Sequence, residues 1–120
     1  MQPPIYKRVV ILAHSVKRHH WCVAGREIFF SKGTWSPGLW IRPVDPAHEG
    51  AITTGTIQLA DGGTPQFLDI VDIPILEWAK DRNHPEDWVV DTAHRWQRHG
   101  VFPLAQLAAL IDRPPNLWKG

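Results

Sequence analysis

Eleven prolines and nine glycines among 120 residues constrain this chain more than any other feature. Proline fixes φ and lacks an amide hydrogen, and glycine favours turns, so both residues interrupt regular elements. This composition favours short strands joined by turns and disfavours helix bundles and coiled coils. With 43% hydrophobic and 21% charged residues, the chain has the composition of a single globular domain.

Runs rich in β-branched and aromatic residues predict five short strands and a sixth near residue 88. In the third run, alternation places Leu39 and Ile41 on one face. Trp40 and Arg42 then share the opposite face. The predicted strands cover residues 9–13, 21–30, 39–42, 53–60, 69–76 and 88–90.

The segment between the first two predicted strands, residues 14–20, is dense in histidine, lysine and arginine. We expect a loop there that is too long for a two-residue hairpin turn. This predicted loop is the first candidate for function. Residues 33–38 and 61–65 contain glycine and proline and are predicted turns.

The predicted strand at residues 69–76 alternates clearly, with Val71, Ile73 and Ile75 on one side. Pro74 cannot donate a hydrogen bond to a neighbouring strand. This strand should therefore lie at the edge of a sheet or end in a bulge.

Two short helices are predicted near the C-terminus. The first is capped by Asp91 or Thr92 and ends at His99, before Gly100. Pro103 suits the first turn of the second. The apolar face of this second helix would consist of Leu104, Leu107, Ala108 and Ile111.

These elements predict a mainly β (α+β) fold, a small barrel of five to six strands with two short C-terminal helices. Residues 1–112 are expected to form one domain. Residues 113–120 contain a Pro-Pro pair and are expected to form a proline-rich tail or linker.

Charge is distributed unevenly along the chain. Residues 1–42 carry seven lysines and arginines against one glutamate, which gives +6, whereas residues 43–91 carry two against ten carboxylates, which gives −8. Such asymmetry suggests an anionic partner on one face, unless the two blocks neutralise each other in the folded protein.

The N-terminal residues lack the apolar segment of a secretion signal, so we expect a cytoplasmic protein. The longest apolar run, residues 9–13, is far too short for a membrane span. The single cysteine, Cys22, excludes an internal disulfide.

Several motifs, in their order along the chain, resemble the bacterial dual OB-containing domain family. They are His-Ser-Val-Lys (14–17), Cys-Val-Ala-Gly (22–25), Trp-Ile-Arg-Pro-Val (40–44), residues 61–66 with 69–74, and Pro-Pro-Asn-Leu-Trp (114–118). The resemblance spans nearly the whole chain but only the first OB-like half of that family. His84 and Asp87 depart from the family pattern, which more often has Gln and Asn there. The resemblance implies an OB-like barrel and nucleic-acid association.

Single-stranded nucleic acid is the leading predicted ligand, because OB-type barrels combine cations for phosphates with aromatic rings for bases. Seven tryptophans are more than a core this small needs, so we expect some to be exposed. The alternative is that these indoles belong to the core and the charges are only solvated. The candidate contacts are Lys17, Arg18, His20, Trp21, Trp40 and Arg42.

A pocket for a small anionic ligand, such as a nucleotide, is a second hypothesis. Its candidate residues are Ser15, Lys17, Cys22 and Arg42. In the simpler interpretation Arg42 pairs with a carboxylate such as Asp45. A third hypothesis is a protein-interaction subunit, in which tryptophans bury against a larger partner or a second OB-like domain and the acidic middle docks.

Catalysis and metal binding have weak support in the sequence. It contains no nucleophile elbow, no phosphate-binding glycine loop and no paired-carboxylate motif. Histidines 14, 19 and 20 lie near Cys22 but lack the paired spacing of a structural zinc site. We therefore expect no catalytic residue, metal or cofactor.

Overall fold

The computed structural model describes residues 5–111, which form seven strands and four short helical segments. The strands are β1 (Ile5–Lys17), β2 (His20–Ser31), β3 (Thr34–Val44), β4 (Ile52–Thr53), β5 (Asp69–Trp78), β6 (Asp87–Val90) and β7 (Gln97–Val101). The helical segments are η1 (Pro46–His48), α1 (Thr54–Ile57), η2 (Leu104–Gln106) and α2 (Leu107–Leu110). No helix within the described residues is long and apolar enough to cross a membrane.

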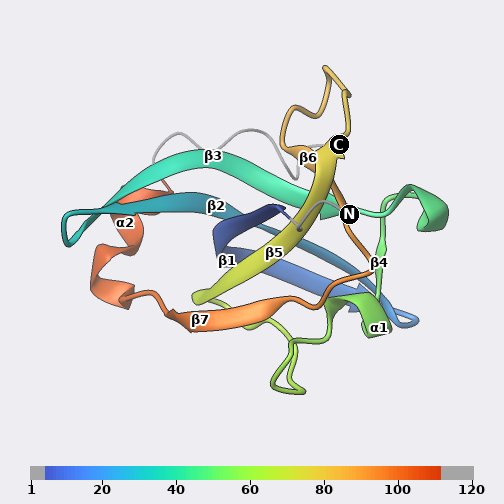
Figure 1. Ribbon diagram of the computed structural model, residues 1–120, viewed down its shortest axis with the longest axis horizontal. Helices are drawn as coiled ribbons and strands as arrows, with labels where there is room; N and C mark the ends of the chain where they lie inside the picture. Colours follow the sequence, from blue (N-terminus) through green and yellow to red (C-terminus); the bar gives the residue numbers. More distant parts are fainter. Residues whose placement is uncertain (1–4, 112–120) are drawn as a thin grey trace.

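Five strands close into a barrel. They pair in the order β1-β2-β3-β6-β5, and β5 pairs again with β1, so that no strand of this ring is left open (Figure 1). Strands β3 and β6 are parallel, whereas the other pairs of the ring are antiparallel. Strand β7 extends the sheet beside β5, and β4 pairs with the start of β2. The predicted mainly β, OB-like barrel is therefore confirmed.

Two apolar cores hold the barrel together. The larger fills its interior, where the predicted face of β5, Val71, Ile73 and Ile75, is confirmed. The smaller lies where Phe102 and Leu110 of the C-terminal segment pack on Val10 and Ile28. Both cores draw on β1 because successive side chains of a strand point to opposite faces.

The C-terminal helical segment is shorter than predicted and uses a different face. Leu107 packs on the smaller core and Leu110 is fully buried, as the segment folds back over the sheet. Leu104 and Ile111, both predicted to be apolar contacts, are exposed. One helical turn cannot bury all four predicted positions at once.

Two hairpin turns are tighter than the sequence indicated. Arg18 and His19 alone connect β1 to β2, with φ of 52° and 66°, and Lys17 is paired directly with His20. The long loop predicted over residues 14–20 is therefore wrong. The next turn consists of Lys32 and Gly33, so the predicted turn at 33–38 is also mostly strand. Positive φ at both positions is typical of two-residue hairpins, but it usually requires glycine or asparagine.

A bulge in β3 corrects the predicted face of Leu39. Arg26 pairs with Trp40, but Ile28 pairs with Pro37, so β3 contains one more residue than β2 between these pairs. Leu39 is consequently 64% exposed, whereas Ile41 is fully buried. A bulge changes the alternation of side chains locally, and residue spacing alone does not reveal it.

Two other predicted elements differ from the structure. The strand predicted at 53–60 is largely replaced by α1, and the helix predicted from residue 91 to His99 is replaced by a turn and β7. β7 forms because it pairs with β5, a contact distant in sequence. β5 is not an edge strand, but a bulge follows Ile75, as one alternative for Pro74 predicted. The predicted tail at 113–120 lies outside the described residues.

Candidate ligand-binding face

Strand pairing places most of the predicted contacts on one outer face. Ser15 is paired with Cys22, and Lys17 with His20. Directly opposed residues of antiparallel strands project from the same side. Val23, the residue after Cys22, is buried in the barrel. Successive side chains of a strand alternate between its two sides, so Cys22 and His20 point outward, as do their partners Ser15 and Lys17.

The same outer face continues onto β3. Ile41 is buried inside the barrel, so its neighbours Trp40 and Arg42 project outward, as the sequence predicted. We call the surface formed by His20, Cys22, Trp40 and Arg42 the β2–β3 face.

Trp21 lies on the other side of β2 from this face. Its ring packs against the interior core, and its indole N–H donates to Thr54 Oγ1 at 3.1 Å. The His14 ring lies 6.3 Å from it, measured between centroids. Of the two tryptophans predicted to contact a ligand, only Trp40 therefore lies on the β2–β3 face.

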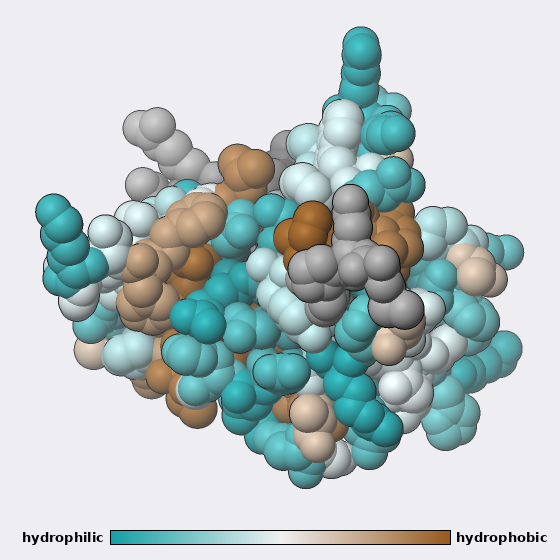
Figure 2. All heavy atoms as spheres, in the orientation of Figure 1, coloured by the Kyte–Doolittle hydropathy of each residue, from teal (hydrophilic) through white to brown (hydrophobic). Residues whose placement is uncertain are grey.

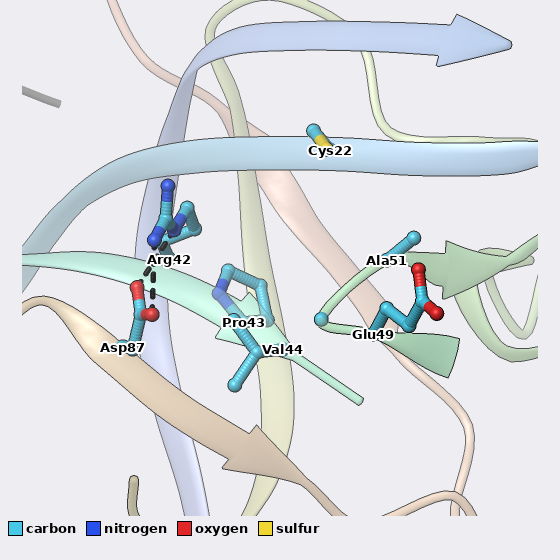
Figure 3. A pocket seen from close by; sticks show the side chains of 8 residues that line it. Cys22, Arg42, Pro43, Val44, Glu49, Ala51 and Asp87 are labelled. Carbon is cyan, nitrogen blue, oxygen red and sulfur yellow. Dashed lines mark hydrogen bonds and ion pairs between the residues drawn. The ribbon is translucent and has the colours of Figure 1, made fainter. Parts of the chain in front are cut away.

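A cavity of about 230 Å³ opens on the β2–β3 face (Figure 3). Two of the predicted pocket residues, Cys22 and Arg42, line it; Ser15 and Lys17 are not among its lining residues. Figure 3 shows Arg42 and Asp87 together on one side and Glu49 on the other. The lining consists of Cys22, Arg42, Pro43, Val44, Glu49, Gly50, Ala51 and Asp87.

Arg42 is held by a carboxylate from the acidic part of the chain. Its Nε and Nη2 donate to the two oxygens of Asp87 at 2.7 and 2.9 Å. The pKa of Arg42 is raised above its ordinary value, chiefly by this hydrogen bonding, with smaller contributions from the nearby charges. The sequence interpretation named Asp45 as a partner, but Asp45 instead accepts a hydrogen bond from the Ala47 amide at the start of η1.

Folding neutralises part of the basic block and leaves part of it free. Arg8 pairs with Asp72 and Arg42 with Asp87, so two of its cations meet the acidic middle. Within residues 5–111, Lys17 and Arg18 form no ion pair. They extend from the β1–β2 turn, at one end of the barrel, where the surface is mainly hydrophilic (Figure 2).

The tryptophans are less exposed than expected. Trp96 is fully buried, and the other five within the described residues are half-buried. Trp40 is among these, with the Arg26 guanidinium 5.8 Å from its ring centroid. The exposed aromatic rings are phenylalanines and a tyrosine, which the sequence reasoning missed: Tyr6, Phe29, Phe30 and Phe67.

Phe29 and Phe30 could have been found from their position. They are consecutive and precede the Lys32-Gly33 turn, so alternation puts one ring on each side at the end of the hairpin, beyond the barrel.

Among residues 5–111, no group of three or more histidine, cysteine, aspartate or glutamate side chains is close enough to hold a metal ion.

Comparison with known proteins gives one match. The family model of the dual OB-containing domain matches residues 7–120. No curated protein and no solved structure matches the chain significantly.

Proposed function

Because this chain belongs to the dual OB-containing domain family, we propose that it is a binding module that holds single-stranded RNA or DNA on its β2–β3 face. Barrels of this class bind oligonucleotides across their second and third strands, between the loops that follow the first and fourth barrel strands. The fourth strand of the ring in chain order is β5, because β4 lies outside the ring. The two loops are therefore the Arg18-His19 turn and residues 79–86. The proposal involves no catalytic step.

The observation that carries the proposal is the free charge at the β1–β2 turn. Lys17 and Arg18 have no ion-pair partner within the described residues, although the acidic middle of the chain neutralises Arg8 and Arg42. His20 lies beside Lys17, so the same end of the face carries a third group able to donate to a phosphate. Such unneutralised cations attract phosphates and release counterions when they bind.

Trp40 supplies the aromatic part of the proposed face. Its ring is half-buried and lies on the same side of the sheet as His20, Cys22 and Arg42. A base stacked on an aromatic ring contributes about 1–3 kcal/mol, and stacking needs only one open ring face. Trp40 is therefore the proposed stacking residue.

A pocket for a small anion is the alternative, and the geometry supports it less. The cavity includes Arg42, but two carboxylates, Asp87 and Glu49, also line it. An anion would have to share Arg42 with Asp87, and the Glu49 carboxylate would repel it.

A protein partner is the third possibility, and the exposed rings of Phe29 and Phe30 could contact it.

Titration of the full chain with mixed-sequence oligonucleotides, RNA and DNA separately, at two salt concentrations tests the proposal. We expect saturable quenching of tryptophan fluorescence that weakens as salt rises. Titration with mononucleotides under the same conditions tests the alternative. Absence of quenching by any oligonucleotide at low salt, with saturable heat from a mononucleotide that Arg42→Ala abolishes, would replace the proposal with the alternative.

A further inference from the structure

A second polar cavity lies beside α1, and the proposed β2–β3 face does not include it. Its volume is about 370 Å³, within the usual range for small-molecule sites. One wall comes from β4 and α1, and the other from the segment between β6 and β7, which passes beside them (Figure 1). The lining residues are Thr53, Gly55, Thr56, Thr92, Ala93, His94 and Arg95.

Buried contacts fix the second wall in place. Trp96, directly after Arg95, is fully buried, and its carbonyl oxygen accepts a hydrogen bond from the Ala60 amide at 2.8 Å. At the other end of the wall, the Asp91 amide donates to the Pro74 carbonyl oxygen at 2.9 Å. The cavity is therefore formed before any ligand arrives, which lowers the entropic cost of binding.

The charge of the lining distinguishes this cavity from its neighbours. Asp87 and Glu49 line the cavity on the β2–β3 face. Asp72 lines a third cavity, which lies between Arg8 and Phe30. In the cavity beside α1, Arg95 is the charged residue, and among residues 5–111 no carboxylate is in the lining. Asp91, the acidic residue of the same segment, accepts one hydrogen bond from the Ala93 amide and pairs with the His94 ring at 3.1 Å.

The remaining lining groups are suited to oxygen acceptors. Thr53, Thr56 and Thr92 contribute hydroxyl groups to the lining, and Thr53 Oγ1 donates to Thr56 Oγ1 at 3.2 Å. Arg95 forms no ion pair within the described residues. A Cβ built on Gly55 would meet no atom of the described residues within 4 Å, so the cavity has room for a ligand beside α1. Guanidinium and hydroxyl donors without a competing carboxylate are the groups that bind phosphate in proteins.

We infer that this cavity binds a phosphate group through Arg95 and the threonine hydroxyls. The phosphate could come from two sources, a free phosphate or nucleotide, or the terminal phosphate of a nucleic-acid strand. The inference does not depend on the β2–β3 face, because the two sites share no lining residue.

Titration of the full chain with inorganic phosphate, followed by amide NMR shifts at constant ionic strength, tests the inference. We expect saturable shifts at the amides of residues 53–56 and 92–95. Arg95→Ala should weaken the affinity about tenfold or more, because a hydrogen bond to a charged group is worth at least that factor. Arg82→Ala is the matched control, since Arg82 is also an exposed arginine without an ion pair within the described residues but lies outside the cavity. It should change the affinity by less than about twofold.

A second arm separates the two sources. Oligonucleotides with a 5′-phosphate and with a 5′-hydroxyl are compared on the wild-type chain and on Arg95→Ala. A gain from the 5′-phosphate that Arg95→Ala removes identifies the strand terminus as the source, and no gain identifies a free phosphate. The Lys17→Ala/Arg18→Ala variant should bind inorganic phosphate with the wild-type affinity. Loss of oligonucleotide binding at the β2–β3 face can therefore be told apart from loss of phosphate binding in this cavity. The inference is overturned if inorganic phosphate gives no saturable shifts there, or if Arg82→Ala weakens binding as much as Arg95→Ala.

Discussion

The guanidinium of Arg42 and the carboxylate of Asp87 join β3 to β6 through two hydrogen bonds, at 2.7 and 2.9 Å. The two residues are also register partners in this parallel strand pair, and the Arg42 amide donates to the Glu86 carbonyl oxygen. Asp87 is buried and Arg42 is half-buried. The pair therefore helps to close the barrel and also forms one wall of the cavity on the β2–β3 face.

Asp87→Ala should destabilise the fold by about 1–3 kcal/mol, because it leaves the half-buried Arg42 guanidinium without its two hydrogen bonds. The pKa of Arg42 is raised, so this stabilisation is fully present below the ordinary arginine pKa and is lost only as the pH rises through the raised value. The decrease in unfolding free energy caused by Asp87→Ala should therefore be the same throughout the neutral pH range. Urea unfolding of the wild type and the variant measures it.

Glu77→Ala is the control for this substitution. Glu77 pairs with Lys80 at 4.0 Å, and both side chains are well exposed, so the loss should be below about 0.5 kcal/mol. Equal losses for the two variants would show that the Arg42–Asp87 pair has no special part in closing the barrel.

Lys17→Ala/Arg18→Ala should reduce oligonucleotide affinity and flatten its salt dependence. Each lost phosphate contact lowers the slope of log affinity against log salt by about 0.7 for a single strand, so the double variant should lose about 1.4. Lys32→Ala removes a cation from the turn at the opposite end of β2, and it should leave the slope unchanged. An unaltered slope in the double variant would remove the β1–β2 turn from the proposed interface.

Trp40→Phe should abolish most of the fluorescence quenching caused by an oligonucleotide, whereas Trp21→Phe should leave it. The reason is that Trp40 lies on the β2–β3 face, while Trp21 packs against the interior core on the other side of β2. Single substitutions measured in parallel titrations separate the two indoles. Quenching that survives in Trp40→Phe but disappears in Trp21→Phe would move the stacking site to the barrel end beside α1.

Gly25→Ala should destabilise the barrel by about 3 kcal/mol or more, because overpacking a filled interior forces the backbone apart. A Cβ at Gly25 would overlap the Val10 carbonyl oxygen and lie 2.7 Å from Val9 Cγ1. At Gly100 in β7, an added Cβ would meet no atom from residues 5–111 within 4 Å. Thermal unfolding should therefore show a large fall in Tm for Gly25→Ala and a small change for Gly100→Ala.

The candidate site could be predicted only in part. The shared face of Trp40 and Arg42 follows from alternation within one strand, and the β3 bulge lies before both residues. The segment predicted as a loop of cations is a strand pair with a two-residue turn. Strand alternation therefore puts Trp21 on the opposite side of the sheet from Lys17 and His20. No local pattern identifies Asp87 as the partner of Arg42, since the two residues are 45 positions apart.

Residue order by itself determined the mainly β class, most strand positions and the buried side of β5. Each of these depends on alternation and turn composition within a few residues, as Val71, Ile73 and Ile75 illustrate. Tertiary structure decided the two tight turns, the outward position of Leu39 and the formation of β7 in place of a helix. Those outcomes depend on hydrogen bonds between paired strands, which the pattern of a few residues does not reveal, and β7 pairs with a strand distant in sequence. Their free energy outweighs the local preferences of the residues involved.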